Sequence, residues 1–163
     1  MRTLVAPLCF LVLGLAPAAG VSEDISWRGT TVQGPRTPSL NTRIGVAMFG
    51  NNEPATYERK ISAAAPPQDG KLVINTENIY RFADGSTLVM RGRELINWTP
   101  GGGHTAGDRW TGEGEITSGT GRFAGATGTF TFRAVMGLDQ QADGLLGDSF
   151  LSGQGRYQLP PAR

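Results

Sequence analysis

Short runs of alternating apolar and polar residues, separated by glycines, constrain this chain more than any other feature. The clearest runs lie between residues 109 and 136. A period of two residues is typical of a strand with one buried face, and glycine gives the backbone the freedom that a tight turn demands. This stretch therefore predicts two half-buried strands of one sheet with a sharp turn between them. The faces expected to be buried hold Trp110, Gly112, Gly114 and Ile116 in the first strand, and Phe130, Phe132, Ala134 and Met136 in the second.

The stretch from Lys71 to Trp98 predicts the strongest hairpin of the chain. Asp84 and Gly85 stand between two alternating runs, and an Asp-Gly pair in that setting is a strong indicator of a hairpin turn. Each run has a face on which apolar residues predominate. These faces hold Leu72, Ile74, Thr76, Asn78, Tyr80 and Phe82 before the turn, and Leu88, Met90, Gly92, Glu94, Ile96 and Trp98 after it.

Further strands are predicted on both sides of these hairpins. A short strand begins at Ile25 and is broken by Pro35 and Pro38, because proline cannot donate a ladder hydrogen bond. A charged run at residues 56–61 reads as a short edge or rim strand, and a final strand is expected over residues 145–157. We find no helical period longer than two turns, so we expect an all-β fold. Between the first strand and the charged run lies another, with Leu40, Thr42, Ile44, Val46 and Met48 on one face.

Residues Gly119 to Phe123 read G-T-G-R-F and are followed by Ala126 and Gly128 ahead of a β-patterned run. This segment resembles the G-T-G-x-F segment of the allene oxide cyclase and dirigent proteins, and the resemblance covers the chain best from about Lys71 onward. It implies an antiparallel, calycin-like barrel of eight strands whose interior holds an apolar small molecule and steers its cyclisation or coupling without a cofactor. Dirigent proteins often carry arginine just before the last glycine of the segment, where this chain has Thr127.

The first 20 residues have the features of a cleavable export signal. Arg2 supplies a positive start, the apolar run at residues 4–15 is too short to span a bilayer, and small residues follow at 16–20. We therefore expect residues 1–20 to be a signal peptide, cleaved after Ala18, Ala19 or Gly20, and residues 21–163 to be one secreted or periplasmic β-barrel domain. Cys9 is the one cysteine of the chain and lies in this signal, so the core alone must hold the mature domain.

Charge and residue types argue against several classes of function. Loss of Arg2 from the 15 basic residues leaves as many as the 14 acidic ones, so no basic stripe indicates nucleic acid as a partner. With His104 as the one histidine, no mature cysteine and no calcium-type acidic run, the chain predicts no metal site. His104 lies in a glycine-rich connection and no G-x-S-x-G elbow is present, which argues against a serine hydrolase. We expect no cofactor and no membrane span.

Glu94 is the exceptional residue on the apolar face of the hairpin. Burying a bare charge is costly, so such a carboxylate has a partner or a raised pKa. Two interpretations follow. Glu94 pairs with Arg91, Arg93 or an arginine of another strand at the barrel rim, or it serves as an acid and base toward a bound substrate. A register shifted by one residue would place it on the opposite face.

A ligand inside the barrel is expected to contact residues near Glu94. Asn78 and Tyr80 share the inward face of the partner strand and would orient a substrate, while Trp98 and Trp110 flank the connection that carries His104. The predicted ligand-binding set is Asn78, Tyr80, Trp98, Trp110, Phe130 and Phe132.

An eight-stranded barrel is either just filled by its side chains or holds one small ligand. Glycines on the inward faces favour a cavity, and bulky aromatic residues favour a plug; this chain has both. Two functions therefore stay open. One is a small-molecule-binding barrel that acts as a cofactor-free isomerase, cyclase or coupling guide, and the other is a non-enzymatic extracellular carrier or interaction module with a filled barrel.

Overall fold

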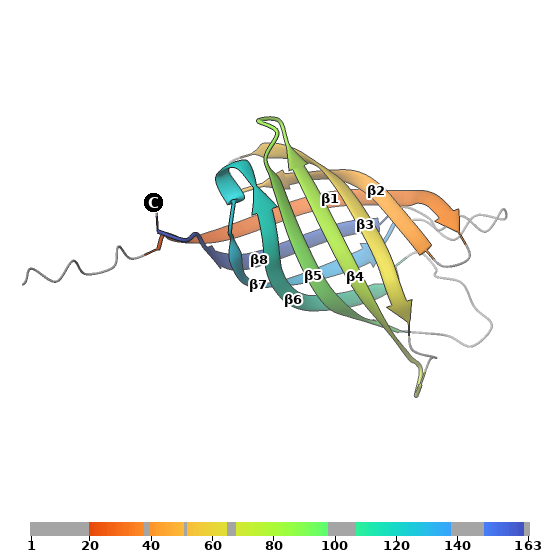
Figure 1. The fold of residues 1–163 in the computed structure, drawn as a ribbon. Coiled ribbons are helices and arrows are strands. Elements are labelled where there is room, and N and C mark those ends of the chain that lie inside the picture. Colours follow the sequence, from red (N-terminus) through yellow and green to blue (C-terminus); the bar gives the residue numbers. More distant parts are fainter. Residues whose placement is uncertain are drawn as a thin grey trace, which may run out of the picture.

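The computed structural model describes residues 20–37, 40–50, 52–64, 68–97, 107–137 and 149–161. In this part of the chain eight strands follow one another, each pairs antiparallel with the next, and the last pairs with the first (Figure 1). The predicted all-β, eight-stranded antiparallel barrel is therefore confirmed. The expected signal segment, Trp98 and His104 lie outside the described residues. The elements are β1 Ser22–Thr37, β2 Leu40–Phe49, β3 Glu53–Ala64, β4 Lys71–Phe82, β5 Thr87–Asn97, β6 Arg109–Thr120, the 3-10 turn η1 Gly121–Phe123, β7 Thr127–Met136 and β8 Ser149–Gln158.

The connections define two ends of the barrel. The links from β2 to β3, from β4 to β5 and from β6 to β7 lie at one end, which we call the turn end. The first residues of β1 and the last residues of β8 pair there as well, with Ser22 opposite Gln158. The strands β1, β3, β5 and β7 finish at the opposite end, which we call the distal end (Figure 1).

The hairpin of β4 and β5 has the register and faces that the sequence predicts. Tyr80, Leu88 and Met90 point inward and each exposes 2% of its surface or less. Gly85 takes a φ of +83° in the turn, a conformation that glycine adopts without the cost that a Cβ brings. The Asp84 carboxylate accepts hydrogen bonds from the Ser86 backbone N–H at 2.8 Å and from its hydroxyl at 2.9 Å, which closes the turn.

Strand β3 is longer than predicted. The charged run at residues 56–61 is the middle of a twelve-residue strand, not a short edge or rim strand. Closure of the barrel explains the difference, because a closed sheet has no edge strands. Tyr57 and Arg59 point inward from β3 and are buried.

Strands β1 and β2 also differ from expectation. Pro35 does not end β1, which continues to Thr37 with a register shift against β2 between Gln33 and Arg36, an irregularity of the kind that accommodates proline in a strand. In β2 the apolar face that the alternation defines points outward, since Val46 is 54% exposed.

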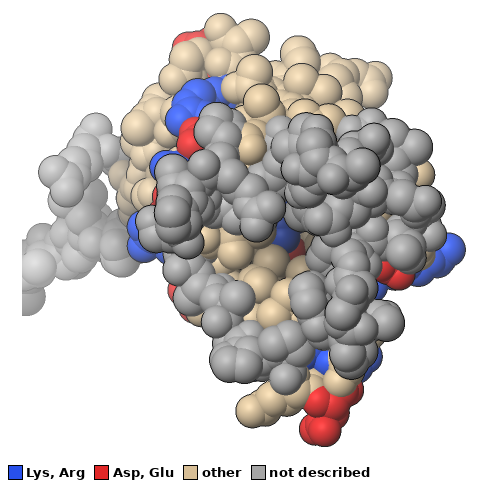
Figure 2. Space-filling view, turned by 90° about the vertical axis from the view of Figure 1, so that its right-hand side faces the viewer, with Lys and Arg blue, Asp and Glu red and all other residues tan. Residues whose placement is uncertain are grey.

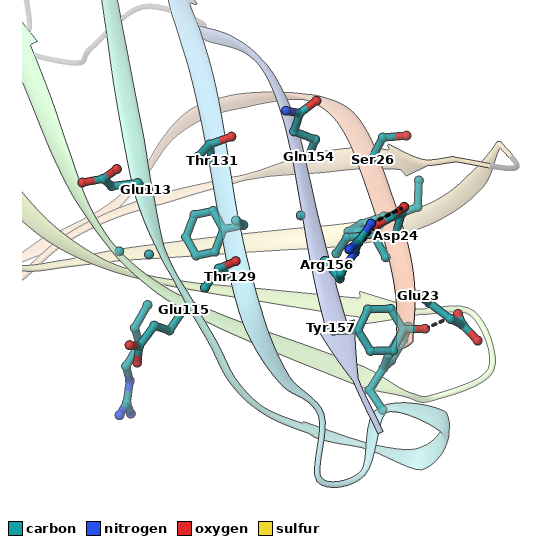
Figure 3. Close-up of a pocket in the computed structure, with 18 of the residues that line it drawn as sticks. Glu23, Asp24, Ser26, Glu113, Glu115, Thr129, Thr131, Gln154, Arg156 and Tyr157 are labelled. Carbon is teal, nitrogen blue, oxygen red and sulfur yellow. Dashed lines mark hydrogen bonds and ion pairs between the residues drawn. The ribbon is translucent and has the colours of Figure 1, made fainter. Parts of the chain in front are cut away.

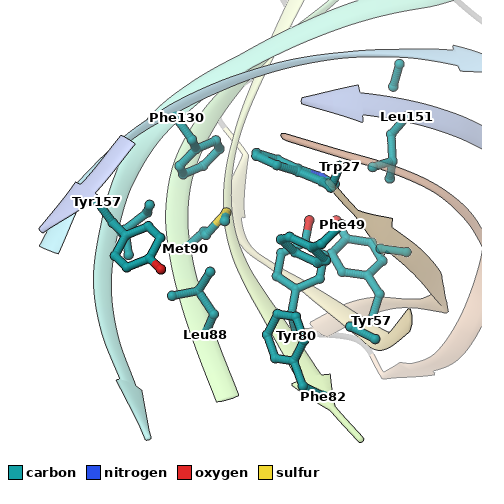
Figure 4. Close-up of a cluster of buried hydrophobic side chains, with 14 of the residues drawn as sticks. Trp27, Phe49, Tyr57, Tyr80, Phe82, Leu88, Met90, Phe130, Leu151 and Tyr157 are labelled. Carbon is teal, nitrogen blue, oxygen red and sulfur yellow. The ribbon is translucent and has the colours of Figure 1, made fainter. Parts of the chain in front are cut away.

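Aromatic side chains fill the half of the barrel next to the turn end (Figure 4). Trp27 stacks on Phe49 with ring centroids 5.9 Å apart, and Tyr57 stacks on Tyr80 at 4.8 Å. Offset and edge-to-face ring pairs of this kind stabilise a core beyond the area that they bury. The rings that make up this aromatic cluster are Trp27, Phe49, Tyr57, Tyr80, Phe82, Phe123, Phe130 and Tyr157.

The G-T-G-R-F segment caps the turn end. Phe123 of η1 is buried, with its ring centroid 5.0 Å from that of Phe82. The Arg122 guanidinium lies 4.7 Å from the centroids of both rings and pairs with Glu53 at 2.6 Å, so a cation–π contact covers the cap from outside. The segment therefore has a structural role, which is to cover the turn end of the barrel.

The inward glycines do not open a cavity at the levels where aromatic rings lie. A Cβ built on Gly92 would come within 2.9 Å of Cζ of Phe130, and one built on Gly112 would overlap the Phe132 ring. These glycines are small because rings of the neighbouring strands occupy the space beside them. The turn-end half of the barrel is therefore a plug.

Candidate functional site

A cluster of polar and charged side chains lies inside the barrel beyond the aromatic cluster, toward the distal end. In the hollow that Figure 2 shows at this end, Lys or Arg atoms lie next to Asp or Glu atoms. The cluster gathers one or two side chains from each of five strands and also from β8. Its members are Thr31 of β1, Arg43 of β2, Arg59 of β3, Thr76 and Asn78 of β4, Glu94 of β5 and Ser149 of β8, and all are buried.

Glu94 is fully buried and forms an ion pair with Arg59. The hydroxyl of Thr76 donates a hydrogen bond to the other carboxylate oxygen, Oε1, at 3.0 Å. The alternation of β5 puts Glu94 on the inward face. Its neighbours across the sheet are Ile74 of β4 and Gly112 of β6.

The partner of Glu94 is an arginine of another strand, as one of the two interpretations proposes. The specific candidates Arg91 and Arg93 are wrong, because both are on the outward face of β5, and Arg91 pairs with Glu77 at 2.8 Å. The pair also lies inside the barrel and not at its rim, with 4% of the Arg59 side chain exposed.

Burial raises the pKa of the Glu94 carboxyl above its ordinary value, because the charged form loses its hydration. The nearby positive charge of Arg59, the hydrogen bond from Thr76 and the indole of Trp110 offset part of this rise. Burial and the neighbouring arginine thus act on the pKa of this carboxyl group in opposite directions, and the effect of burial is the larger.

A hydrogen-bonded row of side chains leads from the aromatic cluster to Glu94. The Tyr57 hydroxyl donates to Oδ1 of Asn78 at 2.7 Å, and the Asn78 amide donates to the Thr76 hydroxyl at 3.5 Å. Thr76 then donates to Glu94. Each donor in this row has one acceptor, so the row fixes the orientation of the Asn78 amide and of the Thr76 hydroxyl.

Arg43 lies next to Arg59, directly opposite it in the register of β2 and β3. Its Nε donates to the Thr31 hydroxyl at 2.9 Å, and one terminal nitrogen donates to the Thr31 carbonyl at 3.1 Å and to the Ser149 hydroxyl at 3.3 Å. The two hydroxyls are 2.7 Å apart. Two arginines are thus held side by side inside the barrel, where like charges opposite one another are unfavourable.

The structure divides the predicted ligand-binding residues between the two halves of the barrel. Asn78 and Trp110 lie near Glu94. Tyr80, Phe130 and Phe132 belong to the plug or pack against it, and Trp98 lies outside the described residues.

Arg43 and Arg59 are not among the site residues predicted from the sequence. The alternation of β2 assigns Arg43 to the less apolar of two faces, and Arg59 lies in a charged run, so neither position carries a signal of burial. A sign was nevertheless present, because Tyr57 alternates with Arg59 and a strand that carries an inward tyrosine carries its second neighbour inward as well.

Two solvent-open grooves run along the wall of the barrel, and the lining of the first includes Thr76 of the interior cluster. Figure 3 shows Glu113, Thr131, Gln154 and Ser26 along one groove, on the neighbouring strands β6, β7, β8 and β1. These side chains are exposed and polar.

No group of three or more histidine, cysteine, aspartate or glutamate side chains that could hold a metal ion occurs among the described residues. The same part of the chain contains no helix of the length and apolar character needed to cross a membrane.

Fold and site together define a closed antiparallel barrel of eight strands with a charged cluster buried in one half of its interior. Comparison with protein-family models, with curated proteins and with solved structures gave no match to this chain.

Proposed function

We propose that this chain is an exported barrel that binds one small molecule in the distal half of its interior, in the manner that its resemblance to the allene oxide cyclase and dirigent proteins implies. The observation that carries the proposal is the buried cluster of Arg43, Arg59 and Glu94. Replacement of a buried ion pair by apolar residues is often neutral or stabilising. A barrel with a purely structural interior would therefore gain nothing from these groups, whereas convergent polar groups in an apolar surrounding are what a ligand site contains.

The aromatic cluster limits where the ligand lies. Rings occupy the turn-end half, so the ligand occupies the space on the distal side of Tyr57 and Tyr80, with the rings as its floor. Apolar walls at the level of the charged cluster are available from Ile74, Ile96 and Leu151, all of which are buried. The predicted contact with Phe130 is thus proposed to be indirect, through the packing of the floor, whereas the Phe132 ring lies over Gly112, the β6 neighbour of Glu94.

The same site supports a cofactor-free isomerisation or cyclisation. In this proposal the Glu94 carboxylate takes up a proton from one atom of the bound molecule and returns it to another, and Arg59 stabilises the negative charge that the bound molecule carries between the two steps. Asn78 and Thr76 keep the carboxylate in one orientation. Unchanged turnover of a demonstrated substrate by Glu94→Gln would refute this role and leave ligand binding in place.

Native mass spectrometry of the protein purified from its own host tests the binding function. We expect a retained small molecule as a mass above that of the bare chain. The matched control is the double variant Arg59→Met/Glu94→Leu, which removes the ion pair and leaves the aromatic cluster intact; it should carry less of the compound or none. Repeated recovery of the bare mass from the unaltered protein would contradict the proposal.

One observation favours a second function, that of a filled barrel which acts through its surface. The outward face of β1 and β2 exposes four apolar side chains, each between 42% and 54% exposed. Sedimentation of the purified protein tests this function, since a stable self-association or partner complex lost on charging this face would support it. The side chains are Val32, Ile44, Val46 and Met48.

A further inference from the structure

We propose that the molecule bound in the distal half is an organic anion, with its carboxylate or equivalent oxyanion held by Arg59 and Arg43 and its apolar body against the neighbouring walls. This inference rests on the proposed binding function and adds the chemical class of the ligand. It follows from how the two arginines are placed and bonded.

The first observation is the pairing of the two arginines. Arg43 and Arg59 are directly opposite one another on β2 and β3, with 2% and 3% of their surfaces exposed. Opposed residues on one face of a sheet have their Cβ atoms about 5 Å apart. Two buried cationic side chains therefore enter the barrel interior from neighbouring positions, and an arrangement of this kind is favourable when an anion lies close to both.

The second observation is a free donor on Arg59. Its terminal nitrogen binds Glu94, but its Nε is buried and has no hydrogen-bond partner among the described residues. An unpaired buried donor costs roughly 1–3 kcal/mol. An oxyanion whose oxygen lies at Nε satisfies that donor with a charge-assisted hydrogen bond.

The third observation is the set of hydroxyl groups beside the arginines. Thr31 and Ser149 accept from Arg43 and bond to one another, so they hold its guanidinium in place. A hydroxyl donor can rotate toward a second oxygen of the anion. The apolar part of the ligand then contacts Ile74, Ile96 or Leu151, which are buried at 4–8% exposure.

The charge of Glu94 determines the direction in which its substitution should change the affinity for an anion. Its carboxylate already occupies one side of Arg59 and repels a second anion. Neutralising it should tighten the binding of an anionic ligand, whereas removing Arg59 should weaken it. A site built for a neutral or cationic ligand would respond to Glu94→Gln in the opposite direction or not at all.

The test uses three probes of the same chain length at pH 7.5: octanoate, 1-octanol and octylammonium, titrated calorimetrically into the mature protein. We expect octanoate to bind roughly 10- to 100-fold more tightly than 1-octanol, the range that one charge-assisted hydrogen-bond pair supplies. Octylammonium should bind most weakly. Acetate and inorganic phosphate should not displace octanoate at equal concentration, because they lack the apolar body.

Variants assign the preference to the cluster. In Glu94→Gln the affinity for octanoate should rise, and in Arg59→Gln it should fall roughly tenfold or more while that for 1-octanol stays the same. Arg133→Gln, an exposed arginine of the outer wall of β7, is the matched control and should change neither. If Arg59→Gln does not fold, the double variant Arg59→Met/Glu94→Leu replaces it.

The possible failures are distinct. Equal affinity for octanoate and 1-octanol, or an octanoate preference that survives loss of Arg59, would overturn the inference while the proposed binding function stands. Displacement of octanoate by phosphate at equal concentration would refute the inference that the ligand has an apolar organic body. Failure of all three probes to bind would overturn the inference together with the binding function.

Discussion

Replacing the buried pair of Arg59 and Glu94 first singly and then together separates a cluster kept for function from one kept for folding. The two side chains are 4% and 0% exposed. Arg59→Met leaves a buried carboxylate without its partner, and Glu94→Leu leaves a buried guanidinium without its partner. Each single change should cost about 3–5 kcal/mol of unfolding free energy. Glu94→Leu also removes the acceptor of the 3.0 Å bond from Thr76, which adds about 1 kcal/mol.

The double variant is expected to lie within about 2 kcal/mol of the unaltered protein, because neither member of the pair remains to be desolvated. Additive losses would instead reach about 7–11 kcal/mol, which is comparable with the whole stability of a typical domain. Arg43 keeps its bonds to Thr31 and Ser149 in every variant of this set. The cycle thus predicts a coupling of several kcal/mol between positions 59 and 94.

Urea unfolding at pH 7, followed by tryptophan fluorescence and by circular dichroism, measures these free energies for the mature protein. Arg133→Met on the outer wall controls for loss of an arginine and should stay within about 0.5 kcal/mol of the unaltered protein. A double variant as unstable as the sum of the single losses would refute the reasoning, because the charged cluster would then be required for the fold. A stable double variant that has lost its ligand would show that the pair serves binding.

Three further predictions concern the pKa of Glu94, the packing of one glycine and the face of β2. Burial raises the folded-state pKa of Glu94 above 4.5. The stability that this shift contributes is therefore present below pH 4.5 and is lost as the pH rises through the folded-state pKa. The difference in unfolding free energy between the unaltered protein and Glu94→Gln should fall from pH 4 to pH 8, and parallel pH profiles of the two proteins would contradict this. Gly153→Ala places a methyl group in the Trp27 ring and should lower the unfolding free energy by about 1–3 kcal/mol; Gly50→Ala, whose Cβ would meet only Ser26 Oγ at 3.7 Å, is the control, and equal stability of the two variants would be inconsistent with the packing. Val46→Lys on the outward face of β2 should change the unfolding free energy by no more than about 0.5 kcal/mol, whereas a loss above about 2 kcal/mol in denaturant unfolding would mean that this face is buried.

The fold could be predicted from the sequence where the alternation and the turn residues agree. In β4 and β5 the apolar residues, the Asp84-Gly85 turn and the position of Glu94 on the inward face all follow from a period of two. The same reasoning failed for β2, because alternation separates two faces without saying which one is inside. The inward face of β2 holds Arg43, Gly45 and Ala47 before Phe49, and over residues 43–48 it is less apolar than the outward face with Ile44, Val46 and Met48.

The occupancy of the barrel depends on contacts between strands that are distant in the sequence. From the sequence, Gly92 and Gly112 on the inward faces favour a cavity, yet the rings of Phe130 and Phe132 of β7 occupy the volume beside them. Likewise the partner of Glu94 lies 35 positions away on β3, two strands removed in the sheet. Neither fact is encoded in a local pattern, because the barrel interior brings together side chains from strands that are not paired.

The contrast between the two halves of the interior is the strongest argument for a function inside the barrel. The turn-end half shows that this chain can fill a barrel with stacked rings. Burial of these largely apolar rings is favourable, because it removes apolar surface from water. At the distal half the chain instead places Arg43 and Arg59 opposite one another and balances Arg59 with Glu94. Charged groups lose their hydration on folding, and the attraction within a buried pair often does not offset this free-energy cost. Selection for stability alone would favour rings or aliphatic residues at all three positions, so the charges are better explained by what they recognise.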